Sequence, residues 1–177
     1  MNYHNITYPD MNNGDGLRVV LWLSGCSHHC YNCQNPQTWD VNSGIPFDES
    51  AKKELFRELE KDYISGLTLS GGDPLHESNL DGVLDLVNEI RLLFPNKSIW
   101  IYSGFRWSEI FNDGVYLTKE CAGWKRREII KQCTVMVDGR YIDAQRNPSK
   151  KWAGSDNQRV IDIQESLKQN QIVLHCD

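Results

Sequence analysis

Short runs of apolar, β-prone residues alternate along this chain with longer stretches in which apolar residues recur every three or four positions. The first pattern predicts strands and the second predicts amphipathic helices. Strands are expected at residues 17–24, 64–70, 98–102 and 133–137, with weaker candidates at 159–163 and 171–175. Helices are expected at residues 48–63, 78–95, 106–111 and 119–132. Strand and helix therefore alternate along most of the chain.

This alternation predicts an α/β fold with a mostly parallel sheet, open or curled into a partial barrel, because helical crossovers join parallel strands. Glycine-containing turns follow three of the expected strands, at Gly25, at Gly71–Pro74 and at Ser103-Gly104. The carboxyl ends of parallel strands gather at one edge of the sheet, where ligands bind. We therefore expect the three turns to converge although they are far apart in sequence.

Length and composition favour a single domain over residues 1–177 with a core of ordinary size. The 19 basic and 24 acidic residues give a net charge of −5, so no general attraction to nucleic acid is expected. The basic run Lys125-Arg126-Arg127 is expected to be a solvated helix face. No apolar run is long enough to span a bilayer, and the first residues lack the features of a signal peptide. We expect no membrane partner and a cytoplasmic location, where cysteines rarely form disulfides.

Three of the six cysteines, Cys26, Cys30 and Cys33, lie close together directly after an expected strand. Packing does not require such clustering in a loop, so the C-x3-C-x2-C spacing indicates metal ligands. A 4Fe–4S cluster has four irons and usually four cysteine ligands, so three cysteines would leave one iron open to a small molecule. His28 or His29 could instead complete a zinc site, although structural zinc sites usually pair two separated ligand knuckles. The residues favour iron–sulfur and leave zinc as the alternative.

The turn Ser70-Gly71-Gly72-Asp73-Pro74 links a strand to a helix, and its glycines would let the backbone approach a ligand closely. No Lys-Ser/Thr follows the glycines, so this is not a phosphate-binding Walker loop. Alone it predicts a tight structural turn, and beside an open-iron cluster it could hold the amino-acid end of a ligand. Cys121, Cys133 and Cys176 are expected to be small buried side chains. Trp39 could shield the cluster from water.

In these segments the chain resembles the radical S-adenosylmethionine (SAM) enzymes. More narrowly, it resembles the small activating proteins of anaerobic ribonucleoside-triphosphate reductase. The cysteine spacing marks the superfamily, and the narrower resemblance rests on further segments in order along residues 1–160. These segments are Gly14-x-Gly16-x-Arg18, Asn35-x-x-Thr38-Trp39, Ser70-Gly71-Gly72-Asp73-Pro74-Leu75, Ile99-Trp100-Ile101-Tyr102-Ser103-Gly104-Phe105, Val137-Asp138-Gly139-Arg140-Tyr141 and Trp152-x-Gly154-Ser155-x-Asn157-Gln158-Arg159.

The resemblance implies a partial (β/α) barrel, a 4Fe–4S cluster held by Cys26, Cys30 and Cys33, and SAM bound at the open iron. One electron from the reduced cluster would cleave a C–S bond of SAM. The resulting 5′-deoxyadenosyl radical would take a hydrogen atom from a glycine of the large subunit of the reductase. Asn32, Cys33 and Gln34 would lie along the bound SAM. Its amino group would meet Gly71, Gly72, Asp73 and Pro74.

No catalytic residue is implied beyond those that hold the cofactors, and a one-electron donor such as flavodoxin is the family expectation. Two other functions stay open. The same chemistry could activate pyruvate formate-lyase or a related glycyl-radical enzyme, although the short chain and Asn157-Gln158-Arg159 favour the reductase. In a different class, the cysteines could staple a zinc-binding module without catalysis.

Overall fold

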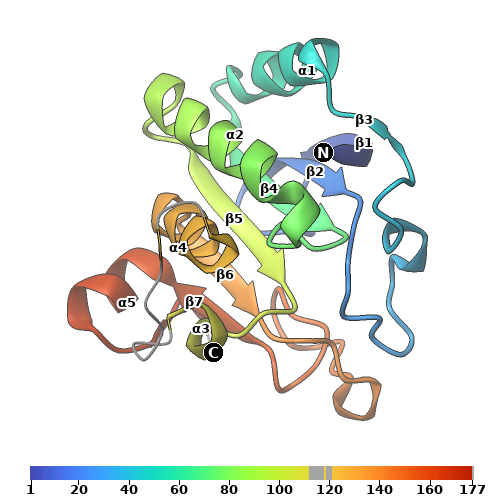
Figure 1. Cartoon of the computed structure of the whole chain (residues 1–177). Helices are drawn as coiled ribbons and strands as arrows, with labels where there is room; N and C mark the ends of the chain where they lie inside the picture. The colour runs from blue at the N-terminus through green and yellow to red at the C-terminus, as the bar shows by residue number, and fades with distance from the viewer. Residues whose placement is uncertain (112–117, 119–120, 177) are drawn as a thin grey trace.

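The computed structural model describes residues 1–111, 118 and 121–176. Figure 1 shows a single twisted sheet with helices packed against it. The strands are β1 (Asn2–Asp10), β2 (Leu17–Leu23), β3 (Ile45–Pro46), β4 (Ile64–Gly71), β5 (Ser98–Ser103), β6 (Val135–Asp138), β7 (Arg159–Asp162) and β8 (Val173–Leu174). The helices are α1 (Glu49–Leu59), α2 (Leu80–Leu93), α3 (Trp107–Ile110), α4 (Ala122–Gln132) and α5 (Ile163–Gln169). Short 3₁₀ turns lie at Pro36–Thr38, Glu77–Asn79 and Asp143–Gln145.

The strand order is β3-β1-β2-β4-β5-β6-β7-β8. Strands β2, β4, β5 and β6 are parallel to one another, whereas the pairs that involve β1, β3, β7 and β8 are antiparallel. The α/β class and the mostly parallel core are therefore confirmed, and the described strands do not close into a barrel. Within the described residues, none of the helices combines the length and apolar character that crossing a membrane requires.

The four central strands match the expected ones to within two residues at each end, because buried parallel strands are nearly continuous apolar runs. The helix expected at 48–63 begins after its cap Asp48 and ends earlier, at Leu59. The helix expected at 78–95 is preceded by a 3₁₀ turn, so α2 begins at Leu80. For the helix expected at 119–132, residues 119 and 120 lie outside the described residues. The pattern missed β1, β3 and α5.

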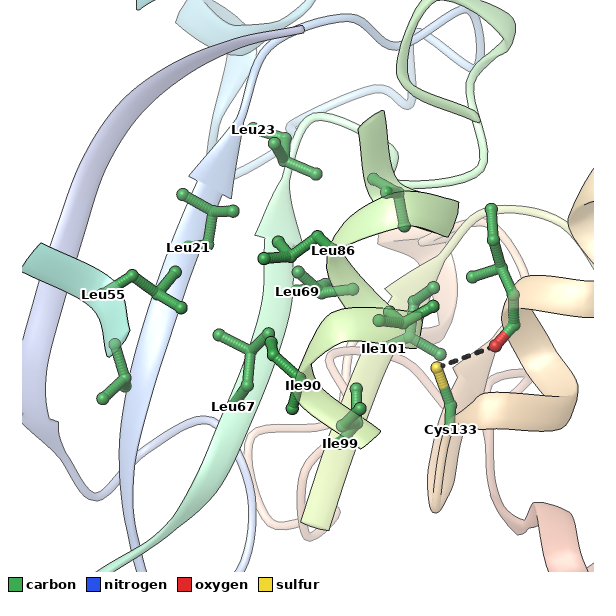
Figure 2. Packing of buried hydrophobic residues seen from close by; sticks show 14 of the residues in the cluster. Leu21, Leu23, Leu55, Leu67, Leu69, Leu86, Ile90, Ile99, Ile101 and Cys133 are labelled. Carbon is green, nitrogen blue, oxygen red and sulfur yellow. Dashed lines mark hydrogen bonds between the residues drawn. The ribbon is translucent and has the colours of Figure 1, made fainter. Parts of the chain in front are cut away.

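The main core lies between the sheet and helices α1, α2, α4 and α5 (Figure 2). On β5, Ile99 and Ile101 face this core. Because neighbouring strand residues point to opposite faces, Trp100 and Tyr102 face the other side. There they pack in a smaller cluster, which Trp152 also contacts. Among the described residues, those that pack on this second face come from strands and loops, and two of them, Tyr102 and Trp152, line a cavity.

Cys133 is fully buried in the main core, and its thiol donates to the carbonyl of Ile129 at 3.3 Å. Burial raises the pKa of Cys133 to about 12. The expectation of a buried side chain is confirmed for Cys133. It is wrong in burial for Cys121 and Cys176, which are half-buried, and Cys121 caps α4 by accepting from the backbone N–H of Trp124.

Arg18 is fully buried on the second face and joins three adjacent parallel strands. Its guanidinium donates to Thr68 Oγ1 at 2.6 Å, to the Leu67 carbonyl at 2.6 Å and to Ser98 Oγ at 2.9 Å. Burial lowers the pKa of Arg18 to about 10. Arg18 therefore stabilises the strands that carry the site rather than the site itself.

The expectation that the basic run on α4 is a solvated face is wrong. Arg126 donates from Nε to the Leu75 carbonyl at 2.9 Å, and its guanidinium lies 4.4 Å from the centre of the Phe105 ring. Arg127 donates to the Ile110 carbonyl at 2.7 Å. These contacts hold α4 against the turns that follow β4 and β5.

Candidate functional site: a cysteine cavity at the strand ends

The three clustered cysteines line one cavity at the carboxyl edge of the parallel strands. This cysteine cavity has a volume of about 130 Å³. Its walls include Cys26, Cys30 and Cys33 from the loop after β2, the turn Gly71–Asp73 after β4, and Tyr102–Gly104 after β5. The segments that the pattern predicted to converge therefore do meet, because parallel β2, β4 and β5 end at the same edge.

Backbone hydrogen bonds fold the cysteine loop back on itself. The N–H of Gly25 donates to the Thr38 carbonyl at 2.7 Å, and that of Cys26 donates to the Trp39 carbonyl at 3.0 Å. Within the loop, Cys33 N–H donates to the Cys30 carbonyl at 3.1 Å. The start and end of the loop are thus held together, which keeps the cysteines on one small surface.

The glycine turn after β4 packs directly on the start of the cysteine loop. Gly72 N–H donates to the Leu23 carbonyl at 2.7 Å, and Asp73 N–H donates to the Gly25 carbonyl at 2.8 Å. A Cβ at Gly72 would lie 2.6 Å from the Gly25 oxygen, and Gly71 has φ +99°. Both positions therefore require glycine for structural reasons. Because the two N–H groups are already used, the carbonyl oxygens of this turn are what it can offer to a ligand.

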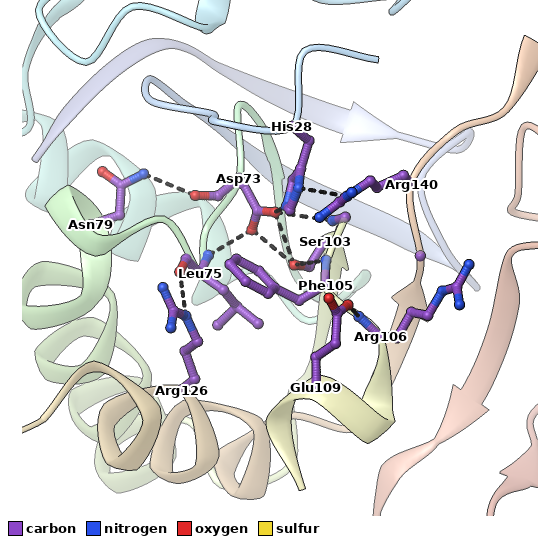
Figure 3. A network of polar contacts seen from close by, with 12 residues as sticks. His28, Asp73, Leu75, Asn79, Ser103, Phe105, Arg106, Glu109, Arg126 and Arg140 are labelled. Atoms are coloured by element: carbon purple, nitrogen blue, oxygen red, sulfur yellow. Dashed lines mark hydrogen bonds and ion pairs between the residues drawn. The ribbon is translucent and has the colours of Figure 1, made fainter. Parts of the chain in front are cut away.

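The Asp73 side chain is buried and connects the three turns (Figure 3). Its carboxylate accepts from His28 Nε2 at 2.7 Å, from Ser103 Oγ at 2.9 and 3.0 Å, and from the Gly104 N–H at 3.0 Å. It also accepts from the Leu75 N–H at 2.8 Å. The carboxylate thus holds the cysteine loop, its own turn and the end of β5 in one arrangement.

His28 extends this network to a fourth strand end. Arg140, which follows β6, donates from Nε to His28 Nδ1 at 3.1 Å. Since Nδ1 accepts, the tautomer with its hydrogen on Nε2 satisfies both Arg140 and Asp73. The His28 ring packs edge-on against Phe105, and a Cβ at Gly104 would lie 2.2 Å from the His28 ring. The sequence alone offers His28 only as a zinc ligand, because its contact with Asp73 depends on a fold that no local motif reveals.

A larger adjoining cavity of about 360 Å³ shares six wall residues with the cysteine cavity: Cys30, Cys33, Ser70, Tyr102, Tyr141 and Gln158. Its other walls include Gln34 and residues of the segment 150–154. A volume of this size falls in the range of small-molecule sites.

The structure brings most of the expected ligand-contacting residues to these two cavities. Gln34 lines the adjoining cavity, and Gly71, Gly72 and Asp73 line the cysteine cavity. Asn32, which is exposed with φ +55°, and Pro74, which is buried, line neither of the two.

Burial raises the pKa of the Cys26 thiol to about 11 and also raises that of the Cys30 thiol. Metal binding at these sulfurs must therefore displace protons, because thiolates are the ligands. Within the described ranges, no three His, Cys, Asp or Glu side chains surround a single point closely enough to hold one metal ion. A 4Fe–4S cluster does not require this, because each cysteine binds a different iron. Three thiols around one cavity fit a cluster that is held by three cysteines.

The comparisons with known proteins agree with a one-cluster iron–sulfur protein. A family described as a 4Fe-4S single cluster domain matches residues 12–161, which contain the cysteine loop and the glycine turn. The match covers most of the chain, so the class of protein is shown.

Proteins with a specific name are also similar to nearly the whole chain. The anaerobic ribonucleoside-triphosphate reductase-activating protein of Enterobacteria phage T4 is 41% identical over 162 residues, which cover 90% of this chain and 93% of that protein. The proteins of the same name from Escherichia coli strain K12 and Haemophilus influenzae are 37% and 34% identical, over 90% of this chain and 97% of each relative. The chain belongs to the family of anaerobic ribonucleoside-triphosphate reductase-activating proteins, which confirms the resemblance drawn from the sequence.

Proposed function

We propose that this protein activates anaerobic ribonucleoside-triphosphate reductase by generating a glycyl radical on its large subunit. The observation that carries the proposal is the meeting of three cysteines on one cavity that opens beside a second, ligand-sized cavity. When bound, a reduced 4Fe–4S cluster would supply one electron for the cleavage of a C–S bond of SAM, and the product of that cleavage would take the hydrogen atom from the glycine. The protein contributes binding, orientation and exclusion of water.

In this proposal Cys26, Cys30 and Cys33 would hold the cluster, and SAM would bind at the iron that has no cysteine ligand. The turn Gly71–Pro74 would accept from the amino group of SAM through carbonyl oxygens, since the N–H groups of Gly72 and Asp73 are engaged. The Asp73 carboxylate is saturated by protein donors, so it acts as a positioning group for the turn.

The adjoining cavity would hold the rest of SAM. Gln34 lies on its wall next to Cys33, and Asn32 lies just before Cys33 on the same loop. Tyr102 and Trp152 supply aromatic surface that limits the access of water to the reacting atoms. The remaining opening is where the glycine-bearing segment of the reductase enters.

The partners of this activity are the large reductase subunit and a one-electron donor such as flavodoxin. Neither nucleic acid nor a membrane takes part, and the chain acts as one domain in the cytoplasm. These assignments stay predictions, and the net charge of −5 is in keeping with the absence of nucleic acid.

Anaerobic reconstitution with iron and sulfide tests the proposal. The loaded protein should be brown, contain close to four irons per chain, and release 5′-deoxyadenosine from SAM once it is reduced. Replacement of Cys26, Cys30 or Cys33 by Ala should abolish that release, whereas the matched control Cys121→Ala should keep it. A colourless protein that retains zinc would instead support the zinc-binding module, and full release from any of the three Ala variants would refute the ligand assignment.

A further inference from the structure

Trp39 places an indole N–H beside the cysteines without a protein acceptor. Its Nε1 atom is buried and makes no hydrogen bond with the described residues. Buried polar groups of native proteins nearly always have a partner, so an unpaired donor needs an explanation. Trp39 lines the cysteine cavity together with Cys26, Cys30 and Cys33. The acceptor for this N–H is therefore expected in whatever those sulfurs hold.

The position of Trp39 is held from two sides. Its carbonyl oxygen accepts from the Cys26 N–H at 3.0 Å, so its backbone is tied to the first cysteine. Its ring packs against the His29 ring at a tilt of 38°, with ring centres 4.8 Å apart. Thr38, the preceding residue, is buried and accepts from Gly25. The indole is thus kept against the cavity rather than left to turn toward solvent.

Two other tryptophans provide a comparison for the unpaired N–H of Trp39. Trp22 is half-buried like Trp39, yet its Nε1 donates to Thr7 Oγ1 at 2.9 Å. Trp152 also has a buried, unpaired Nε1, but it lines the adjoining cavity and not the cysteine cavity. Among the described residues, Trp39 is therefore the tryptophan with a buried, unpaired indole N–H that lines the cavity shared by all three cysteines.

We propose that Trp39 Nε1 donates a hydrogen bond to a sulfur atom of the bound cluster and thereby raises its reduction potential. The inference rests on the proposed function, because it requires the cluster. Cluster sulfurs carry negative charge that increases when the cluster gains an electron. A donor near them stabilises the reduced form more than the oxidised form, and hydrogen bonds to sulfur are one of the means by which proteins set cluster potentials.

The test uses the reconstituted full chain labelled with ¹⁵N in the indole of tryptophan. Pulsed EPR of the reduced cluster should show an indole ¹⁵N coupling that is lost in Trp39→Phe, which keeps an aromatic ring and removes the N–H. At a fixed ambient potential, the ratio of reduced to oxidised cluster should fall about three- to tenfold in Trp39→Phe. This change corresponds to the net free energy of about one hydrogen bond. Trp107→Phe is the matched control and should change neither result, since Trp107 packs on Phe111 and lines neither cavity.

Each outcome decides the matter. A Trp39→Phe protein with full iron content, unchanged coupling and unchanged potential overturns the inference while leaving the proposed function standing. If Trp39→Phe does not hold a cluster, the labelled Trp152→Phe protein decides, because a persisting coupling there supports Trp39 and a missing coupling overturns it. If the wild-type protein holds no cluster under any reducing condition, the proposed function and this inference both fail.

Discussion

The Asp73 carboxylate joins three strand ends, so its replacement by Asn should cost stability even without any cofactor. Asn keeps the shape of Asp but places an NH₂ group where one carboxylate oxygen accepts from three donors. That oxygen, Oδ2, accepts from His28 Nε2 at 2.7 Å, from the Gly104 N–H at 3.0 Å and from Ser103 Oγ at 3.0 Å. The other oxygen accepts from the Leu75 N–H. In either orientation of the Asn amide, its NH₂ group would face a backbone N–H, that of Leu75 or that of Gly104. Both groups are donors, so no hydrogen bond can form between them.

The magnitude follows from these contacts. Hydrogen bonds to a charged group contribute roughly 1.5–3 kcal/mol each, and a buried donor left unpaired costs about 1–3 kcal/mol. We therefore expect Asp73→Asn to lower the free energy of unfolding by about 3–5 kcal/mol, a large part of the roughly 5–15 kcal/mol typical of a domain. Ser103→Ala, which removes one neutral donor from the same carboxylate, should cost only about 1 kcal/mol.

The assay is urea unfolding of the metal-free protein under reducing conditions, followed by circular dichroism. The midpoint should fall by about 1 M or more at a constant denaturant slope. The double variant should be less destabilised than the sum of the two single variants, because both changes act on one network. A loss below about 1 kcal/mol for Asp73→Asn would refute the view that Asp73 positions the strand ends.

Three further predictions concern separate parts of the chain. Arg18→Met should lower the free energy of unfolding by about 2–4 kcal/mol in the same urea assay, because three strands lose their shared donor; an unchanged midpoint would contradict this. Gly104→Ala should displace the His28 ring, at an overpacking cost of about 1–3 kcal/mol in the free energy of unfolding. The variant should therefore bind less iron on reconstitution, and a wild-type iron content would contradict the role of the network around Asp73 and His28. In the folded, metal-free protein at pH 8, Cys133 should resist iodoacetamide while half-buried Cys121 reacts, because burial raises the pKa of Cys133 to about 12. Mass spectrometry checks this, with urea-unfolded protein as the control in which both must react, and rapid labelling of folded Cys133 would disprove its placement.

The parts of the fold that the sequence predicts well are those with a strong local pattern. Strands β2, β4 and β5 are rich in Leu, Val and Ile, and a serine or glycine ends or follows each of them, so their ends could be placed within a residue or so. Strand β1 was missed because its residues are mostly half-buried and give no clear alternation. Helix α5 was missed because Asp162 ends β7 and caps the helix at once, so one apolar segment serves two elements.

The candidate site likewise has a part that the sequence predicts and a part that only the structure shows. Cys26, Cys30 and Cys33 are close in sequence, so their spacing alone predicts a shared ligand. The contacts of Asp73 with His28 and Ser103 join residues 45 and 30 positions apart. They exist only because parallel strands end at a common edge. Sequence reasoning could place these turns near one another but could not show that Asp73 is saturated by protein donors.

The central claim is that this chain puts a radical on its partner, and EPR of the partner tests it most directly. The protein, reconstituted without oxygen, would be incubated with the large reductase subunit, SAM and a one-electron reductant. The account predicts a glycyl-radical doublet on the reductase that requires SAM and disappears with the Cys30→Ala variant. A fully loaded protein that cleaves SAM but leaves the reductase without such a signal would contradict it.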